Sequence, residues 1–296
     1  MKSVLGSLLI LCSAVGFGGL ALFAHEAYAA GVDTSTLLAM RFGIAAVVLV
    51  AVIIARRYPW PKARAMRGYI IMGVLYAITA WSYFKALNFA TSGTVSLLLY
   101  TSPVMVTVAS AILGLERFGK PEWLALCGVS IGLFFLLGTG LQSTIVGVLL
   151  GLNSALVYTF YILLGSRIGA GSHPISSSTV VVISAGIIFL GLSLWNGVHL
   201  PSTPRGWGAV TMMAVMGTLI GILTFVAGLN LVGPTIASVL STIEPVITMF
   251  LGVTFLGEFV GGGSMIGAAL ILLASTGLAV HRLFRERSSQ LPLQQS

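Results

Sequence analysis

The sequence predicts an all-α integral membrane protein whose ten transmembrane helices form two inverted five-helix repeats. Three observations lead to this fold class: the composition, the recurrence of long apolar runs, and an internal repeat. Hydrophobic residues make up 57% of the 296 positions and charged residues 7%, and the mean hydropathy is +1.05. Soluble domains carry far more charge, so the composition indicates that lipid surrounds most of the chain.

Apolar runs of about 20 residues, long enough to cross a bilayer core, recur along the chain. The first run follows Lys2 and ends near Ala27–Ala30, as in a secretory signal peptide, but it is longer than a signal-peptide core of about 7–15 residues. We therefore interpret it as the first membrane helix. The ten expected spans lie near 4–24, 34–55, 68–88, 92–114, 122–138, 145–166, 176–196, 207–228, 233–256 and 263–282.

The basic residues between these spans predict the orientation of the protein, because cytoplasmic loops are enriched in Lys and Arg. With the N-terminus inside, only Lys85 and Arg205 lie on the external side, and both termini are cytoplasmic. The net charge of +8 is spread over loops, which does not indicate a nucleic-acid partner. The cytoplasmic side holds Lys2, Arg56, Arg57, Lys62, Arg64, Arg67, Arg117, Lys120, Arg167, Arg282, Arg285 and Arg287.

An internal repeat divides the chain into two parts. Asn88, Pro103 and Glu116 recur 142 positions later as Asn230, Pro245 and Glu258, within Leu87–Glu116 and Leu229–Glu258. We expect one five-helix repeat over residues 1–141, a second over 145–285, and a disordered cytoplasmic tail over 286–296. An odd number of spans makes the second repeat enter the membrane in the opposite sense. Inverted repeats are typical of secondary transporters, which bind substrate near the midplane and alternate their access.

These halves resemble the drug/metabolite transporter superfamily, in particular its EamA-type exporters. The resemblance is carried by "SPVMVTVASAILGLE" (Ser102–Glu116), "EPVITMFLGVTFLGE" (Glu244–Glu258) and "MRF" (Met40–Phe42), and it covers all ten spans. Among these exporters the chain looks most like the bacterial exporters of aromatic and other neutral amino acids. The resemblance implies that the third, fourth, sixth, eighth and ninth spans line the substrate cavity.

Lys85 is a candidate ligand for a substrate carboxylate. Trp81, Lys85 and Asn88 share one helix face at i, i+4 and i+7, near the external end of the third span. The alternative is that the lysine only extends its charge to the membrane surface. For Arg41 in the second span we favour that alternative, or hydrogen bonds to backbone carbonyls.

Aromatic residues form a second group of candidate ligands. Tyr76 and Tyr83 share a face of the third span, Tyr100 precedes the proline of the fourth, and Tyr158 lies within the sixth. Their rings would stack on an aromatic substrate and still accept aliphatic ones. The alternative is an aromatic belt at the membrane interface, which suits the mid-span Tyr100 and Tyr158 poorly.

Glu244 is a carboxyl group near the centre of the ninth span, and Pro245 follows it. Because proline has no N–H, Pro245 and the matched Pro103 should kink their helices. Glu244 either ties its helix to a neighbour or meets the ammonium group of the substrate, or a proton. Gly217 and Gly221 form a small-residue pair that allows close helix contact and hinge motion.

The sequence therefore predicts a multi-pass secondary transporter of the bacterial inner membrane that exports neutral and aromatic amino acids by alternating access. An exchanger of phosphorylated metabolites or nucleotide sugars would need several buried cations. The sequence also shows no rings of charged side chains of the kind that ion channels use, which argues against a channel. Protease dyads and metal-ligand clusters are not found in the sequence, so no enzyme, cofactor or metal is expected. We expect a monomer whose partners are its small-molecule substrate and the lipid bilayer.

Overall fold

The computed structural model describes residues 2–114, 119–138, 143–168 and 172–290, and this part of the chain contains helices and no strand. The predicted Glu116 and the repeat boundary at residue 141 lie outside these ranges. The helices are α1 Lys2–Gly18, α2 Leu20–Ala29, α3 Thr34–Arg56, α4 Ala63–Ala86, α5 Ser92–Leu99, α6 Ser102–Ile112, α7 Lys120–Gly138, α8 Ile145–Ile168, α9 Pro174–Asn196, α10 Pro204–Ala214, α11 Gly221–Ser241, α12 Ile243–Leu256 and α13 Gly262–Gln290.

The bounds of most predicted spans agree with these helices because apolar runs end where charged and turn-forming residues begin. One difference is at the C-terminus, where α13 continues to Gln290. The predicted tail therefore includes a helical part, since Arg285, Glu286 and Arg287 are residues that favour helix. Another difference is that the π-helical segment Val215–Ile220 (η1) joins α10 to α11.

The structure contains seven segments that are long and apolar enough to cross a membrane, among the described residues. The first combines α1 and α2, and another combines α5 and α6. Outside this set lie α4, α7 and α12, of which α12 has only 14 residues. The membrane-protein fold is thus supported, while the number of ten spans stays a prediction.

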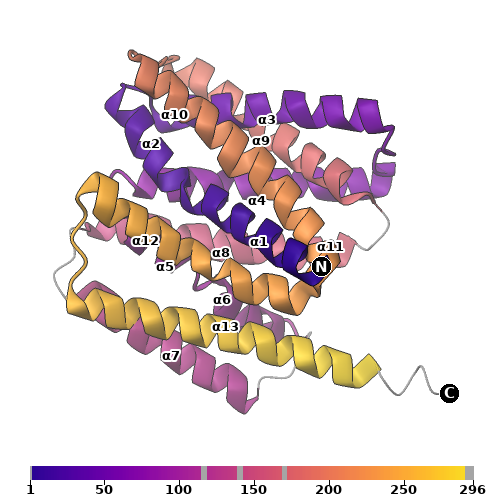
Figure 1. The fold of residues 1–296 in the computed structure, drawn as a ribbon, viewed down its shortest axis with the longest axis vertical. Coiled ribbons are helices and arrows are strands. Elements are labelled where there is room, and N and C mark those ends of the chain that lie inside the picture. The colour runs from indigo at the N-terminus through magenta and orange to yellow at the C-terminus, as the bar shows by residue number, and fades with distance from the viewer. Residues whose placement is uncertain (1, 115–118, 139–142, 169–171, 291–296) are drawn as a thin grey trace.

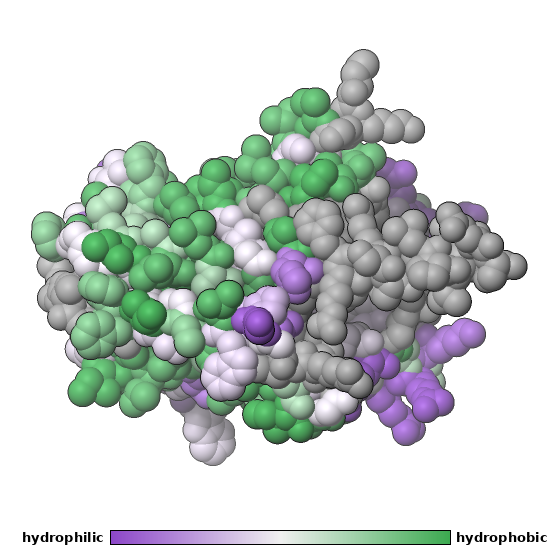
Figure 2. All heavy atoms as spheres, turned by 90° about the horizontal axis from the view of Figure 1, so that it is seen from below, coloured by the Kyte–Doolittle hydropathy of each residue, from purple (hydrophilic) through white to green (hydrophobic). Residues whose placement is uncertain are grey.

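Apolar side chains cover the outside of the helix bundle. Trp195, Ile112 and Leu124 are among the most exposed, and 89% of the Trp195 surface is accessible. In the face drawn in Figure 2, hydrophobic residues cover much of the coloured surface. An apolar surface of this extent requires lipid contact, which agrees with the membrane segments.

The helices pair across the two halves of the sequence (Figure 1). The main pairs are α1 with α11, α2 with α10, α3 with α9, α4 with α8, α5 with α12 and α7 with α13. If the halves are exchanged with an offset of 142, the pairs α3–α9 and α7–α13 map onto themselves, and α1–α11 and α4–α8 map onto each other. This pattern is what two related halves would produce.

Two helices are interrupted at corresponding places. The break between α5 and α6 lies at Tyr100 and Thr101, and the break between α11 and α12 lies at Thr242, 142 positions after Tyr100. Each break comes shortly before a proline, Pro103 or Pro245, which cannot donate to the carbonyl four residues earlier. The missing backbone N–H of Pro103 and Pro245 thus explains why the helices are interrupted at these positions.

The chain reverses its direction along α1 between Val232 and Ile247. Gly6, near the start of α1, lies against Gly228 and Val232, whereas Gly18, the last residue of α1, lies against Ile247 of α12. Thr248 also donates to the carbonyl of Gly18 at 3.1 Å. Helical hydrogen bonding continues through the predicted boundary at residues 229–232, while the segment that is apolar enough to span a membrane ends at Leu229, so the boundary stays a prediction.

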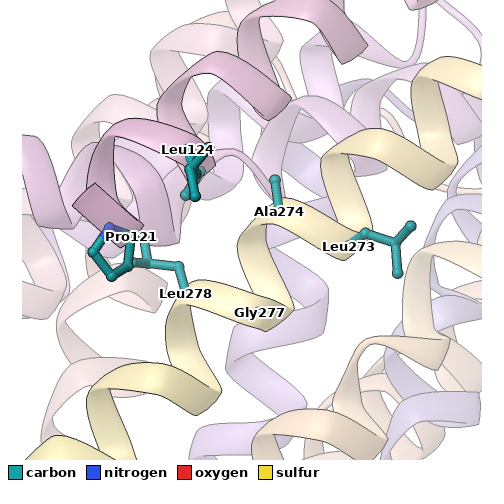
Figure 3. Close-up of a pocket in the computed structure, with 7 residues that line it drawn as sticks. Pro121, Leu124, Leu273, Ala274, Gly277 and Leu278 are labelled. Atoms are coloured by element: carbon teal, nitrogen blue, oxygen red, sulfur yellow. The ribbon is translucent and has the colours of Figure 1, made fainter.

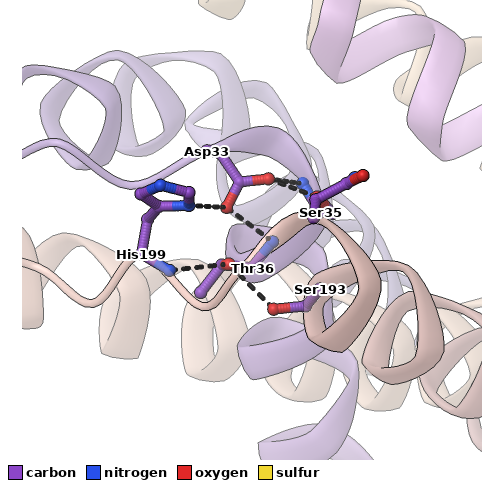
Figure 4. A network of polar contacts seen from close by, with 6 residues as sticks. Asp33, Ser35, Thr36, Ser193 and His199 are labelled. Atoms are coloured by element: carbon purple, nitrogen blue, oxygen red, sulfur yellow. Dashed lines mark hydrogen bonds and ion pairs between the residues drawn. The ribbon is translucent and has the colours of Figure 1, made fainter.

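One end of the bundle holds a network of polar contacts (Figure 4). Asp33 caps α3 by accepting hydrogen bonds from the backbone N–H groups of Ser35 and Thr36, and its Oδ1 lies 3.5 Å from Nδ1 of His199. Thr36 contacts Ser193 of α9 through their hydroxyl groups at 2.8 Å. Burial favours the neutral form of Asp33, but the hydrogen bonds from Ser35 and Thr36 outweigh it and hold the pKa of this carboxyl below its usual value. The network fixes the start of α3 against the end of α9.

We predict that Asp33→Ala lowers the free energy of unfolding by about 1 kcal/mol, because the N-cap is lost. A lowered folded-state pKa means that the ionised cap stabilises the protein above the ordinary carboxyl pKa and is lost as the pH falls through the lowered value. The difference from wild type in thermal unfolding should therefore shrink in acid. Asp33→Ser, which keeps a capping oxygen, is the control. A difference that is unchanged in acid would contradict this account.

A second prediction concerns the contact of α1 with η1. A Cβ on Gly16 would lie 2.5 Å from the carbonyl oxygen of Met216, whereas a Cβ on Gly43 would meet nothing within 4 Å. Gly16→Ala should destabilise the protein by about 1–3 kcal/mol through overpacking. Gly43→Ala should be neutral or stabilising by about 0.5–1 kcal/mol. Thermal unfolding in detergent measures both, and equal effects would exclude the packing explanation.

Candidate functional site

Five tyrosines from three helices gather inside the bundle. We call them the tyrosine cluster: Tyr76 and Tyr83 of α4, Tyr100 at the end of α5, and Tyr158 and Tyr161 of α8. The rings of Tyr158 and Tyr161 stack with centroids 5.5 Å apart, and Tyr76 lies 5.7 Å from Tyr161. Tyr83 and Tyr158 also lie within electrostatic range of Tyr100. Rings from both halves of the sequence thus meet in one place.

Packing of α4 against α8 sets the positions of these rings. Ser154 donates to the carbonyl of Thr79 at 3.0 Å, and the side-chain amide of Asn153 donates to the hydroxyl of Ser82 at 2.8 Å. Glycines on α8 permit close packing on both sides, since a Cβ on Gly165 would lie 3.0 Å from Met72 of α4 and one on Gly151 would lie 2.6 Å from Leu98 of α5. All five tyrosines keep part of their surface accessible. Rings with accessible surface inside a bundle can contact a small molecule.

Glu244 lies next to this cluster. The hydroxyl of Tyr100 lies 3.2 Å from the carboxyl oxygen Oε2 of Glu244 and donates to the carbonyl of Ser241 at 2.7 Å. Tyr83 and Tyr158 lie within electrostatic range of the same carboxyl group. The described residues form one ion pair, between His199 and Asp33, so Glu244 has no cationic partner among them.

Arg41 of α3 is fully enclosed, with 2% of its surface exposed. Its Nε donates to the hydroxyl of Thr218 at 2.8 Å and its Nη2 lies 3.5 Å from the carbonyl of Gly217, both in η1. Its guanidinium also lies 5.0 Å from the ring centroid of Phe42 and 5.3 Å from that of Phe84. Arg41 therefore does not extend to the membrane surface. Its contact with the carbonyl of Gly217 agrees with the second predicted alternative, hydrogen bonds to backbone carbonyls.

Lys85 and Trp81 are not brought together with the tyrosine cluster. A helix turns about 100° per residue, so Lys85 points to the side of α4 opposite Tyr76 and Tyr83. Trp81 is 38% exposed and continues an outer stripe of α4 that includes Ile78 and other exposed apolar residues. Asn88, just after the end of α4, lies beside the carbonyls of Phe84 and Lys85 and the side chain of Tyr28. This placement favours a lysine that reaches the membrane surface.

The residues predicted as hinges lie at helix contacts and breaks. Pro103 and Pro245 follow the two helix interruptions. A Cβ on Gly217 would lie 2.2 Å from Leu20, and one on Gly221 would lie 2.9 Å from the ring of Phe17. These glycines therefore permit α1 and α2 to pack closely against η1 and α11. Their motion during transport stays a prediction.

Two neighbours of the site, Tyr161 and the carbonyl of Ser241, are not among the candidate residues predicted from the sequence. Tyr161 follows Tyr158 by three positions, a spacing that places both rings on adjacent parts of one helix face. The carbonyl of Ser241 is the group that Pro245 cannot satisfy, which marks it from sequence as in need of another donor. That Tyr100 supplies this donor depends on the packing of α5 against α12 and follows only from the structure.

Two grooves elsewhere on the protein are lined mainly by apolar side chains. One lies between α7 and α13 (Figure 3) and is lined by Pro121, Leu124, Ala125, Leu273, Ala274, Gly277 and Leu278. Another lies between α4 and α9 and includes Ile70, Val74 and Ile187. Neither contains a charged group, so the tyrosine cluster is the better candidate site. Groups of three or more metal-ligating side chains are not found in the part of the chain that the structure describes.

Comparisons with known proteins identify the type of protein that the chain resembles. The model of the EamA-like transporter family matches residues 4–138 and 145–280. The chain is 23% identical to the uncharacterized transporter YcbK of Bacillus subtilis, over 95% of each chain. It is 24% identical to the uncharacterized inner membrane transporter YedA of Escherichia coli, over 79% of this chain and 78% of that protein. A crystal structure shares the fold with a TM-score of 0.65 at 20% identity, over 95% of this chain and 98% of the other.

Proposed function

The chain belongs to the EamA-like transporter family, and we propose that it exports neutral and aromatic amino acids across the bacterial inner membrane. The observation that carries this proposal is the tyrosine cluster beside Glu244. Aromatic planes with polar tips favour aromatic side chains and also accept aliphatic ones. A carboxyl group among them suits the ammonium group that all such substrates share.

Transport would proceed by alternating access between two inverted repeats, residues 1–141 and 145–285. The helix pairing supports this proposal because each half of the sequence packs mainly against the other. The breaks before Pro103 and Pro245, together with the close contacts at Gly217 and Gly221, are the proposed places of motion. The protein would act as a monomer without a cofactor.

Exchange of phosphorylated metabolites or nucleotide sugars is a weaker proposal. A phosphate group would need several cations, and Arg41 is a single buried cation near the tyrosine cluster. Flux of radiolabelled substrates into proteoliposomes separates the possibilities. Exchange of phosphate esters without amino-acid flux, or an ionic conductance, would refute the amino-acid proposal.

We predict that Tyr158→Ala raises the KM for phenylalanine several-fold and changes the KM for alanine less. The lost stacking contact is worth about 0.5–1.5 kcal/mol, which corresponds to about a twofold to tenfold change. Tyr58→Ala is a matched control, because Tyr58 stacks on His173 at an interhelical loop instead, with centroids 3.8 Å apart. Equal changes for both substrates, or for both variants, would count against substrate stacking.

The proposed orientation places both termini in the cytoplasm. With Cys12 and Cys127 replaced by alanine, a cysteine at the exposed Val198 should react with a membrane-impermeant maleimide applied to intact cells. A cysteine at the exposed Arg64 should react only after the membrane is permeabilised. The reverse pattern of labelling would show that the protein is inserted the other way round.

A further inference from the structure

The two helix breaks differ in how their backbone carbonyls are satisfied. At the break between α5 and α6, Thr101 donates its hydroxyl to the carbonyl of Leu98 at 2.7 Å, and Ser275 of α13 donates to the carbonyl of Tyr100 at 2.9 Å. Both donors are hydroxyls that do not titrate in the physiological range. This break therefore has the same hydrogen bonds at any ordinary pH.

The break between α11 and α12 depends on a donor that is shared with an acid. The Tyr100 hydroxyl has a single proton, and both the Ser241 carbonyl at 2.7 Å and Glu244 Oε2 at 3.2 Å lie within its reach. If Glu244 is protonated, it can donate to the oxygen of Tyr100 while Tyr100 donates to Ser241, and all three groups are satisfied. If Glu244 is ionised, its carboxylate competes with the carbonyl for the tyrosine proton.

The break does not need a carboxyl group. Ser102 occupies the position before Pro103 that corresponds to Glu244, and the side-chain hydrogen bonds to the carbonyls of Leu98 and Tyr100 at the first break come from hydroxyls. Glu244 has no described ionic partner, and an ionised group held that way is costly inside a membrane. The Glu244 carboxylate would therefore be neutralised either by a proton or by a cationic group of the substrate.

Among the residues that the structure describes, no cation forms an ion pair with Glu244. The helices packed against α12 are α1, α2, α5 and α11. From the end of α5 comes Tyr100, α11 contains no titratable side chain, and Cys12 of α1 is exposed. The charged residue of α1 is Lys2, at the end of the helix opposite Gly18, which lies against Glu244. On α2 lie His25, Glu26 and Tyr28, and the carboxylate in electrostatic range of His25 is Glu258. From α4 and α8, Tyr83 and Tyr158 also face Glu244.

We propose that Glu244 binds either a proton or the ammonium group of the substrate, so that the two compete and the protein acts as a proton/amino-acid antiporter. This inference rests on the proposed function and names the ion to which export is coupled. In the exchange step, the Glu244 carboxyl loses its proton to water and the carboxylate takes the ammonium. When the ammonium leaves on the other side of the membrane, a proton from water restores the neutral carboxyl.

The hydrogen bonds at the break give this exchange a structural effect. The neutral carboxyl completes a chain of bonds from α12 through Tyr100 to Ser241 at the end of α11. Loss of the proton turns the Tyr100 donor toward the carboxylate and leaves the Ser241 carbonyl unpaired, which loosens the contact between α5 and the end of α11. The charge of the site and the position of a helix break therefore change together.

The test uses the full-length protein, Glu244→Gln, and Glu258→Gln as the matched control. Glu258 accepts two hydrogen bonds from Ser92 and lies at the far end of α12. In weakly buffered detergent solution, phenylalanine should release protons from the wild type and the control, and none from Glu244→Gln, as measured with a pH indicator. In the wild type, the apparent affinity should fall as the pH is lowered, by up to about tenfold per pH unit.

Transport in proteoliposomes separates this inference from the proposed function. A pH gradient should drive phenylalanine accumulation by the wild type and the control but not by Glu244→Gln, while Tyr100→Phe should shift the pH at which affinity is half-lost. Wild-type exchange of amino acids that ignores pH, or proton release that persists in Glu244→Gln, would overturn the proton assignment and leave the export proposal standing. Failure of every amino acid to exchange would overturn the export proposal, and this inference with it.

Discussion

Hydrocarbon offers no hydrogen-bond partner to a peptide group, so a membrane helix can be interrupted only where other groups satisfy its backbone. This constraint explains the arrangement around both helix breaks. Hydroxyls of Thr101, Ser275 and Tyr100 donate to the carbonyls of Leu98, Tyr100 and Ser241 beside the two breaks. The breaks in turn bring Glu244 into the bundle beside the tyrosine cluster, so the chemistry of the candidate site depends on how the backbone is satisfied.

The same constraint acts where helices cross without a break. Ser13 donates to the carbonyl of Gly221 at 2.8 Å, and Arg41 reaches the carbonyl of Gly217 in the π-helical segment. Such a segment widens the helix and leaves carbonyls that side chains can reach. Glycines at the crossing of α1 and η1 let the backbones approach closely enough for these bonds. Polar contacts and small residues together replace the hydrophobic driving force that is missing between helices in lipid.

Much of the fold follows from the sequence because apolar length and helix-end residues are local properties. Thr34 and Asn196 mark helix ends close to the predicted positions, and the breaks lie next to prolines that are visible in the sequence. The site was harder to predict. The spacing of Trp81 and Lys85 shows that they share a face, but which side of α4 faces the bundle depends on its packing against α8 and α9.

The pairing of helices across the sequence also bears on how the protein is made. When α7 has entered the membrane, its partner α13 is still to be synthesised, and α3 is likewise synthesised long before its partner α9. The early helices carry buried polar residues such as Arg41 and Ser110, which lack their final surroundings during this interval. Folding is therefore dominated by contacts distant in sequence, which form late and slowly. A chain that ends before Gly262 would contain most partners of its first half, but its α7 would lack α13, against which it mainly packs.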